Sequence, residues 1–277
     1  MEISMNNLKI GFTGGGNMAS SLIGGLIADG HPPHLIRVSE PDGQRRSMLA
    51  AHGVESISDN QGIASWADVL VLAVKPQIMK AVCLDIAPGV AASRALVVSV
   101  AAGIPVASLE QWLGQQTAIV RCMPNTPAMV QSGATGLFAN AATSTDQKNA
   151  AECLLRSVGL ALWLKHESLM DAVTAVSGSG PAYYFLFMEA MEQAAVDLGL
   201  DEETARLLTG QTILGASRMA MESDVSPAEL RRRVTSPGGT TEQAIRVFEE
   251  HHLQQTIKTA MEAAYRRARS MAEELGA

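Results

Sequence analysis

The sequence has few cysteines, no excess of positive charge and no long apolar run, and each absence excludes a class of protein. Its three cysteines, Cys83, Cys122 and Cys153, are an odd set, widely spaced, with no C-x-x-C pair and no pair of histidines nearby. This spacing predicts neither a disulfide framework nor a zinc site, so we expect no bound metal. The formal net charge of −7 argues against nucleic acid as the main partner.

No stretch has the composition of an export signal or a membrane span. Residues 1–4 contain no basic segment followed by an apolar one. No apolar run reaches about 18 residues without a polar break. We therefore expect a cytoplasmic protein with no membrane partner. A chain of 277 residues, 47% of them hydrophobic, can bury a large core and predicts two domains.

Three consecutive glycines separate a short apolar strand from a helix near the start of the chain. Residues 8–12 alternate as in a strand, and residues 20–29 follow the pattern of a helix. Between them, Gly14, Gly15 and Gly16 begin a G-x-G-x-x-A pattern that allows close approach of a ligand to the backbone. Free N–H groups and the positive end of the helix can then hold a pyrophosphate. By itself, the pattern also fits a plain strand-to-helix turn.

The end of the next predicted strand, residues 35–39, is where a dinucleotide-binding fold contacts the adenosine ribose. Glu40 lies about twenty residues beyond the glycines and favours NADH, because a carboxylate accepts a hydrogen bond from the ribose 2′-hydroxyl. Small polar and basic side chains, which admit the 2′-phosphate of NADPH, are also present: Ser39, Arg45, Arg46 and Asn60. The two arginines fit a solvated helix face equally well, so the sequence leaves the coenzyme open.

Three more apolar runs, at residues 69–74, 96–100 and 119–121, have the pattern of strands buried in a parallel sheet. The first is followed by Lys75-Pro76, and the second by the small residues 101–103. Small residues there let a flat ring approach the backbone, although they also suit close packing of a helix on a strand. Ligands of open α/β sheets bind beyond the carboxyl ends of the strands, so these ends are candidate sites.

Residues 160–164 look like a last strand, and the character of the sequence changes after it, near residue 165. Long helical patterns replace strand patterns from about residue 167, which predicts a mostly parallel α/β domain at 1–165 and an all-α domain at 166–277. The helix that begins at Pro181 is apolar nearly all round. Such a helix must be buried on most sides, so we infer a partner subunit.

A second group of hydroxyls and glycines precedes a helix that begins near Gly239. Ser236, Thr240 and Thr241 bring hydroxyls, and the helix start exposes N–H groups that suit a small carboxylate. The alternative is an ordinary N-cap, in which Thr240 or Thr241 closes the helix and an acidic or amide side chain reaches back.

The sequence shows no cluster of histidines, of cysteines or of metal ligands that could act between these two stretches. This limits the chemistry that the protein can perform. Hydride transfer fits, because a nicotinamide carries the reaction and the protein only orients it against an electrophilic carbon. We expect the six histidines to be ordinary exposed side chains rather than general bases.

Six motifs follow one another along nearly the whole chain: GFTGGGNMA at 11–19, AVKP at 73–76, VAAG at 100–103, RCMPNTPA at 121–128, DAVTAVSGSGPAYYF at 171–185 and VTSPGGTT at 234–241. In their order and spacing, these motifs resemble the pyrroline-5-carboxylate reductase family. The resemblance implies a Rossmann-like N-terminal domain and an all-α dimerisation domain interlocked with that of a second subunit, in dimers that can assemble further. It also implies reduction of L-1-pyrroline-5-carboxylate to L-proline by NADPH, with NADH as an alternative, in the last step of proline biosynthesis.

The resemblance also assigns site residues. The cofactor would be held by Thr13, Gly14, Gly15, Gly16, Asn17, Met18, Ser39, Asn60, Ala73, Val74, Lys75, Pro76, Ala101, Ala102 and Gly103. The substrate would be held by Ser236, Gly239, Thr240 and Thr241. The Thr241 hydroxyl would lie near the ring nitrogen as the catalytic group, orienting the imine and helping to relay a proton.

Two other functions fit parts of the pattern. A dehydrogenase of the 3-hydroxyacid type also joins a Rossmann domain to helices, but it relies on a lysine of the helical domain. Here the only lysine beyond Lys165 is Lys258, far along the chain from both glycine stretches. A non-catalytic regulator that only senses NADP(H) is the other alternative, and the intact stretch at 234–241 argues against it.

Overall fold

The computed structural model describes residues 7–276, which divide into two compact units. The first unit runs to Ser179 and takes in the chain again from Ala264, and the second unit is Gly180–Ala263. The predicted boundary at residue 165 lies within the first unit and differs from this division by compactness, and it stays a prediction.

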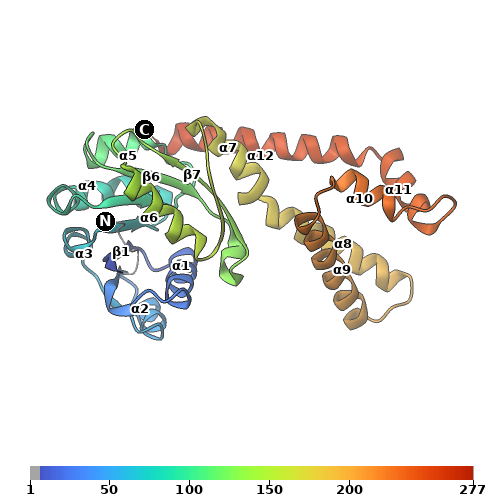
Figure 1. The fold of residues 1–277 in the computed structure, drawn as a ribbon, viewed down its shortest axis with the longest axis horizontal. Helices are drawn as coiled ribbons and strands as arrows, with labels where there is room; N and C mark the ends of the chain where they lie inside the picture. The colour runs from blue at the N-terminus through green and yellow to red at the C-terminus, as the bar shows by residue number, and fades with distance from the viewer. Residues whose placement is uncertain (1–6, 277) are drawn as a thin grey trace. The chain divides into compact units, whose positions relative to one another are not determined.

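An eight-stranded sheet forms the centre of the first unit, in the order β3-β2-β1-β4-β5-β6-β7-β8 (Figure 1). The first six strands in this order run parallel to one another. Strand β7 is antiparallel to β6, and β8 is parallel to β7. This is the mostly parallel Rossmann-like sheet that the sequence predicted. Strands β3 and β7 were not among the predicted strands. The strands are β1 Ile10–Thr13, β2 Ile36–Ser39, β3 Glu55–Ile57, β4 Val69–Leu72, β5 Leu96–Ser99, β6 Ile119–Met123, β7 Gly133–Ala139 and β8 Gly159–Trp163.

Helices cover both faces of this sheet. The helices are α1 Asn17–Ala28, α2 Gly43–Ala50, α3 Asn60–Trp66, α4 Pro76–Ser93, α5 Val106–Leu113 and α6 Thr145–Arg156. Apolar side chains of α1, α2 and α6 form one core cluster, and those of α3, α4 and α5 form the other. Strand β4 supplies both: Val69 and Val71 face the first cluster, and Leu70 and Leu72 face the second. Burial on both faces explains the unbroken apolar run in its sequence.

The chain leaves the first unit through α7 (Met170–Val173) and a π-helical turn, Thr174–Gly178. The second unit contains α8 Gly180–Asp197, α9 Glu202–Glu222, α10 Pro227–Arg233, α11 Thr240–Glu250 and the first part of α12, Leu253–Leu275. In the first unit, the end of α12 packs on α5, where the Ser108 hydroxyl donates to the Gly276 carbonyl at 2.5 Å. None of the helices in residues 7–276 has the length and apolar composition that a membrane span requires.

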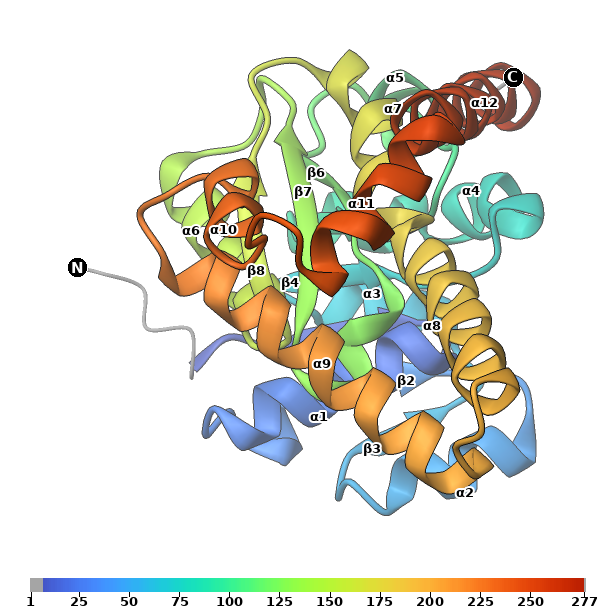
Figure 2. The same cartoon turned by 90° about the vertical axis from the view of Figure 1, so that its right-hand side faces the viewer.

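Helices α8 and α9 form a hairpin with almost no interior of its own (Figures 1 and 2). In residues 180–263, all of them described, only Gly180, Ala205 and Thr209 are fully buried. Large apolar side chains of α8 are instead exposed, among them Phe185 at 61% and Leu186 at 67%. A single chain therefore does not bury the apolar α8 helix as its composition requires.

Candidate functional site

The carboxyl ends of five parallel strands lie level along one edge of the sheet. In the pairing register, Thr13 is opposite Ser39 on one side and Leu72 on the other. Ser39 is in turn opposite Ile57 of β3, and Leu72 is opposite Ser99. The strand order reverses between β1 and β4, which is the switch point where dinucleotides bind in such folds. All fifteen predicted cofactor residues belong to the first unit, at or just beyond these strand ends.

The glycine turn after β1 is held by the neighbouring strands. Gly14 has a φ of +92°, and its N–H donates to the Ser39 carbonyl at 2.8 Å. A Cβ at Gly14 would lie 2.7 Å from the Ala73 carbonyl oxygen. Thr13 is fully buried, and its hydroxyl donates to the Val71 carbonyl at 3.4 Å, so only its backbone belongs to the turn. A glycine at position 14 is thus required by both conformation and space.

Helix α1 begins at this turn with its first N–H groups free of any side-chain cap. Gly16 is the N-cap residue, no side chain caps the helix, and a Cβ built on Gly16 meets nothing within 4 Å. Asn17 and Met18, the first two helical residues, are exposed and half-buried. An uncapped helix start beside open space fits a diphosphate, because the N–H groups and the helix dipole both favour an anion.

The residues predicted to contact the ribose lie at the end of β2 or in the segments that follow β2 and β3. Ser39 is buried, and Asn60, the first residue of α3, is half-buried. Arg45 is half exposed, as on a solvated helix face. Arg46 instead donates to the backbone carbonyls of Glu40 and Pro41, each at 2.8 Å. The structure therefore places Glu40, which favours NADH, beside the small polar and basic side chains that favour NADPH.

The next two strand ends complete this edge of the sheet. The Ala73 N–H donates to the Thr13 carbonyl at 2.8 Å, and Val74, which follows, is half-buried against the second core cluster. Lys75 is the N-cap of α4 and Pro76 its first residue, again with no side-chain cap. After β5, Ala101 and Ala102 lead to Gly103, whose φ is +75°.

The loop at Gly103 also packs on the end of α12 within the first unit. A Cβ on Gly103 would lie 3.2 Å from Leu275 Cδ1 and 3.4 Å from Met271 Cβ. The sequence pattern gave no sign that the last helix returns to the sheet in this way.

In the second unit, the predicted substrate residues surround the start of α11. Gly239 is its N-cap and no side chain caps the helix, so the alternative in which Thr240 or Thr241 is the cap is wrong. The Gly239 N–H donates to the Ser236 carbonyl at 3.0 Å, which folds the loop back on itself. Glu242 does reach back, accepting from the Gly238 N–H at 2.8 Å. An uncapped helix start beside two hydroxyl residues can hold a carboxylate.

Two buried polar contacts of the first unit were not predicted. Asn125, in the loop after β6, donates to the Ser177 carbonyl at 3.0 Å and accepts from the Ala134 N–H at 2.8 Å. It therefore ties the π-helical turn to β7. Its position just beyond a strand end was the available signal, since a buried amide there must find partners.

The other reactive groups of the described residues include two buried thiols and a buried histidine. Burial raises the pKa of the Cys83 thiol to about 12, and it also raises the pKa of Cys122, so both stay protonated. His31 is 2% exposed, which corrects the expectation that the histidines are all at the surface. Among the described residues, no three of His, Cys, Asp and Glu are placed to hold a metal ion.

Comparisons with known proteins cover both parts of the chain. Residues 167–271 match the family model "Pyrroline-5-carboxylate reductase dimerisation", and residues 9–103 match "NADP oxidoreductase coenzyme F420-dependent". A pyrroline-5-carboxylate reductase of Pseudomonas aeruginosa is 54% identical over 98% of this chain and 100% of its own length.

Solved structures agree with this result. The reductase of Coxiella burnetii superposes with a TM-score of 0.91 at 48% identity, covering 96% of this chain and 98% of the other. The Plasmodium falciparum enzyme, solved with NADP bound, gives 0.88 at 31% identity over 97% and 100%. Motifs, fold and full-length identity lead to one conclusion: this chain belongs to the pyrroline-5-carboxylate reductase family.

Proposed function

We propose that this protein reduces the cyclic imine L-1-pyrroline-5-carboxylate to L-proline, the last step of proline biosynthesis, in the cytoplasm. The observation that carries the proposal is the pair of uncapped helix starts, at Gly16 and Gly239, in a member of this family. Each can hold an anion without a lysine, one a diphosphate and the other an amino-acid carboxylate. NADPH is the proposed coenzyme, with NADH as the alternative.

On this proposal, residues 13–18 hold the pyrophosphate and the ends of β2, β4 and β5 hold the rest of the coenzyme. When bound, the coenzyme supplies a hydride to the imine carbon. The substrate carboxylate accepts hydrogen bonds from Ser236 and from the N–H groups of Thr240 and Thr241. The Thr241 hydroxyl orients the ring nitrogen and helps relay a proton to it, so that hydride and proton together convert the C=N bond to CH–NH.

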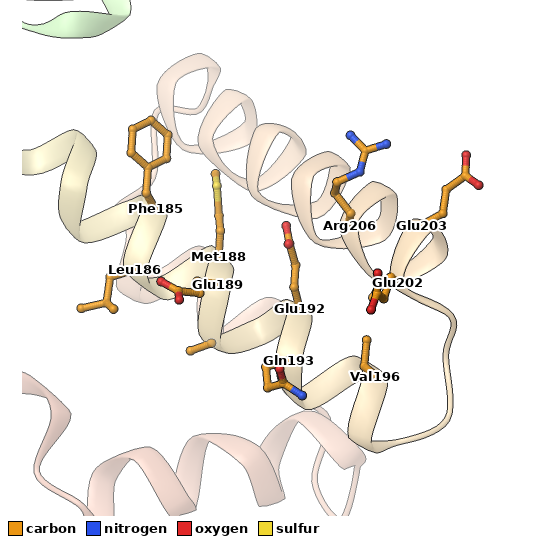
Figure 3. A pocket seen from close by; sticks show the side chains of 12 residues that line it. Phe185, Leu186, Met188, Glu189, Glu192, Gln193, Val196, Glu202, Glu203 and Arg206 are labelled. Carbon is orange, nitrogen blue, oxygen red and sulfur yellow. The ribbon is translucent and has the colours of Figure 1, made fainter.

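We further propose that the second unit works as part of a homodimer, from which larger homo-oligomers can form. The match of residues 167–271 to a dimerisation model supports this, as does the exposure of α8. A groove between α8 and α9 is lined by side chains of both helices, and Figure 3 shows Phe185, Met188 and Glu192 projecting from one side of α8. A second copy would bury the exposed apolar side chains of α8, such as Phe185 and Leu186.

Purified full-length protein mixed with pyrroline-5-carboxylate and either coenzyme tests the reaction. Loss of nicotinamide absorbance with proline as the product supports the proposal. Coenzyme binding without turnover would instead indicate a regulator. Turnover only with a 3-hydroxyacid and the oxidised coenzyme would indicate the dehydrogenase.

A further inference from the structure

Glu40 is buried at the predicted coenzyme edge with both carboxylate oxygens bonded. Its side chain is 5% exposed. Oε2 accepts from the Gly15 N–H at 2.8 Å, and Oε1 accepts from the Asp42 N–H at 3.0 Å. The carboxylate therefore bridges the glycine turn after β1 and the residues that begin α2. Rotating it away would leave two backbone donors unpaired.

The charges around this carboxylate are close to balance. The Arg45 guanidinium is 4.0 Å from Glu40 Oε2, and Arg46 is bonded to the carbonyls of Glu40 and Pro41. Asp42 adds a second carboxylate, which accepts from the Arg45 N–H at 3.0 Å and caps α2. Two arginines and two carboxylates thus lie close together, so this edge carries no excess of positive charge to pair with a 2′-phosphate.

NADH and NADPH differ only at the ribose 2′-position. A carboxylate at the end of the second strand accepts a hydrogen bond from a 2′-hydroxyl. A 2′-phosphate brings about two negative charges to the same place, beside a carboxylate held by two N–H groups. We infer that Glu40 is the coenzyme-discriminating residue: it weakens binding of NADPH relative to NADH, so that the enzyme accepts both.

This inference rests on the proposed function only in placing a nicotinamide coenzyme at this edge. The competing explanation is that Glu40 merely braces the glycine turn. A brace would affect both coenzymes equally, because the pyrophosphate that the turn holds is common to the two. The ratio of the two affinities therefore separates discrimination from bracing.

The test measures dissociation constants, by calorimetry, for two nucleotide pairs: NADPH with NADH, and 2′-phospho-ADP-ribose with ADP-ribose. The second pair has no nicotinamide, so its binding is independent of turnover. Glu40→Gln keeps the side-chain size and removes the charge, and Glu40→Ser also shortens the side chain. In both variants we expect preference for the 2′-phosphorylated member of each pair to rise about tenfold.

The control is Glu55→Gln, which removes the β3 carboxylate from a partly exposed ion pair with Arg37 of β2 and should leave the ratios unchanged. A change of less than twofold in both Glu40 variants, with binding intact, overturns the inference alone. The inference is also overturned if the wild-type protein binds 2′-phospho-ADP-ribose more than a hundredfold more tightly than ADP-ribose. This measurement does not depend on any variant folding. If no nucleotide binds, both the inference and the proposed function fail. If nucleotides bind but the imine is not reduced, only the proposed reaction fails.

Discussion

Arg121 on β6 and Glu167, just before α7, form a charged hydrogen bond of 2.7 Å in which the arginine side chain is 6% exposed. The same Glu167 oxygen accepts from the Val106 N–H at 2.8 Å, at the first residue of α5. One carboxylate thus joins a central strand, the start of a helix and the segment that leads out of the first unit.

Glu167→Ala should lower the free energy of unfolding by roughly 3 kcal/mol, because it leaves a buried guanidinium unpaired. Glu55→Ala breaks the Arg37–Glu55 pair, which has the same 2.7 Å distance but side chains 34% and 54% exposed. That control should cost less than about 1 kcal/mol. Urea unfolding at one fixed protein concentration compares the two. Equal losses would show that burial does not strengthen the Arg121–Glu167 contact.

Ser236→Ala and Thr241→Ala should reduce imine reduction while leaving the melting temperature and coenzyme affinity nearly unchanged. Loss of the Ser236 hydroxyl should raise KM for the imine about tenfold, since it removes a hydrogen bond to a charged group. Loss of the Thr241 hydroxyl should lower kcat by about a hundredfold. Thr241→Ser, which keeps a hydroxyl, should restore most of kcat. Thr145→Ala, at the exposed first residue of α6, is the control. Unaltered kinetics in both alanine variants would remove the substrate-site assignment.

Gly14→Ala should lower the stability of the protein, whereas Gly16→Ala should lower only its affinity for the coenzyme. A Cβ at position 14 meets the Ala73 carbonyl at 2.7 Å with φ at +92°, so the protein should lose about 1–2 kcal/mol of stability or more. A Cβ at position 16 meets nothing within 4 Å, so the fold should be unchanged. Coenzyme affinity of Gly16→Ala should nevertheless fall about tenfold, because the methyl group keeps the diphosphate from the N–H groups. Thermal unfolding and coenzyme titration check both. Full affinity in Gly16→Ala would place the diphosphate elsewhere.

Stability should fall as the pH drops, partly through His31. Burial lowers the pKa of His31 below its ordinary value of 6.5, and backbone groups of Leu35 and Leu8 only partly oppose this. As the pH falls below about 6.5, the unfolded chain binds a proton at this histidine and the native protein does not, so unfolding is favoured. His31→Gln should make the fall in unfolding free energy between about pH 7 and pH 5 shallower. His52→Gln, at an exposed histidine, should not. Parallel slopes in wild type and His31→Gln would contradict this.

Much of the first unit could be predicted because its signals are local. Strands β4 and β5 are continuous apolar runs, and the glycines after β1 mark a turn that only glycine adopts. Strands β3 and β7 were missed because they are partly exposed or rich in small residues, so their alternation is weak. Asn125 and the Arg121–Glu167 pair were missed because their partners lie 9 to 52 positions away in the chain.

The sequence by itself determined most of the buried strands and the two glycine-rich turns, since each depends on residues close together in the chain, and it determined the family, since the motifs follow one another in order. Only the tertiary structure decided that Glu40 is tied to Gly15, that Gly239 rather than a threonine is the N-cap of α11, and that the last helix returns to the first unit at Gly103. These outcomes depend on which distant groups satisfy buried donors and fill space beside a glycine, and local pattern carries no information about that.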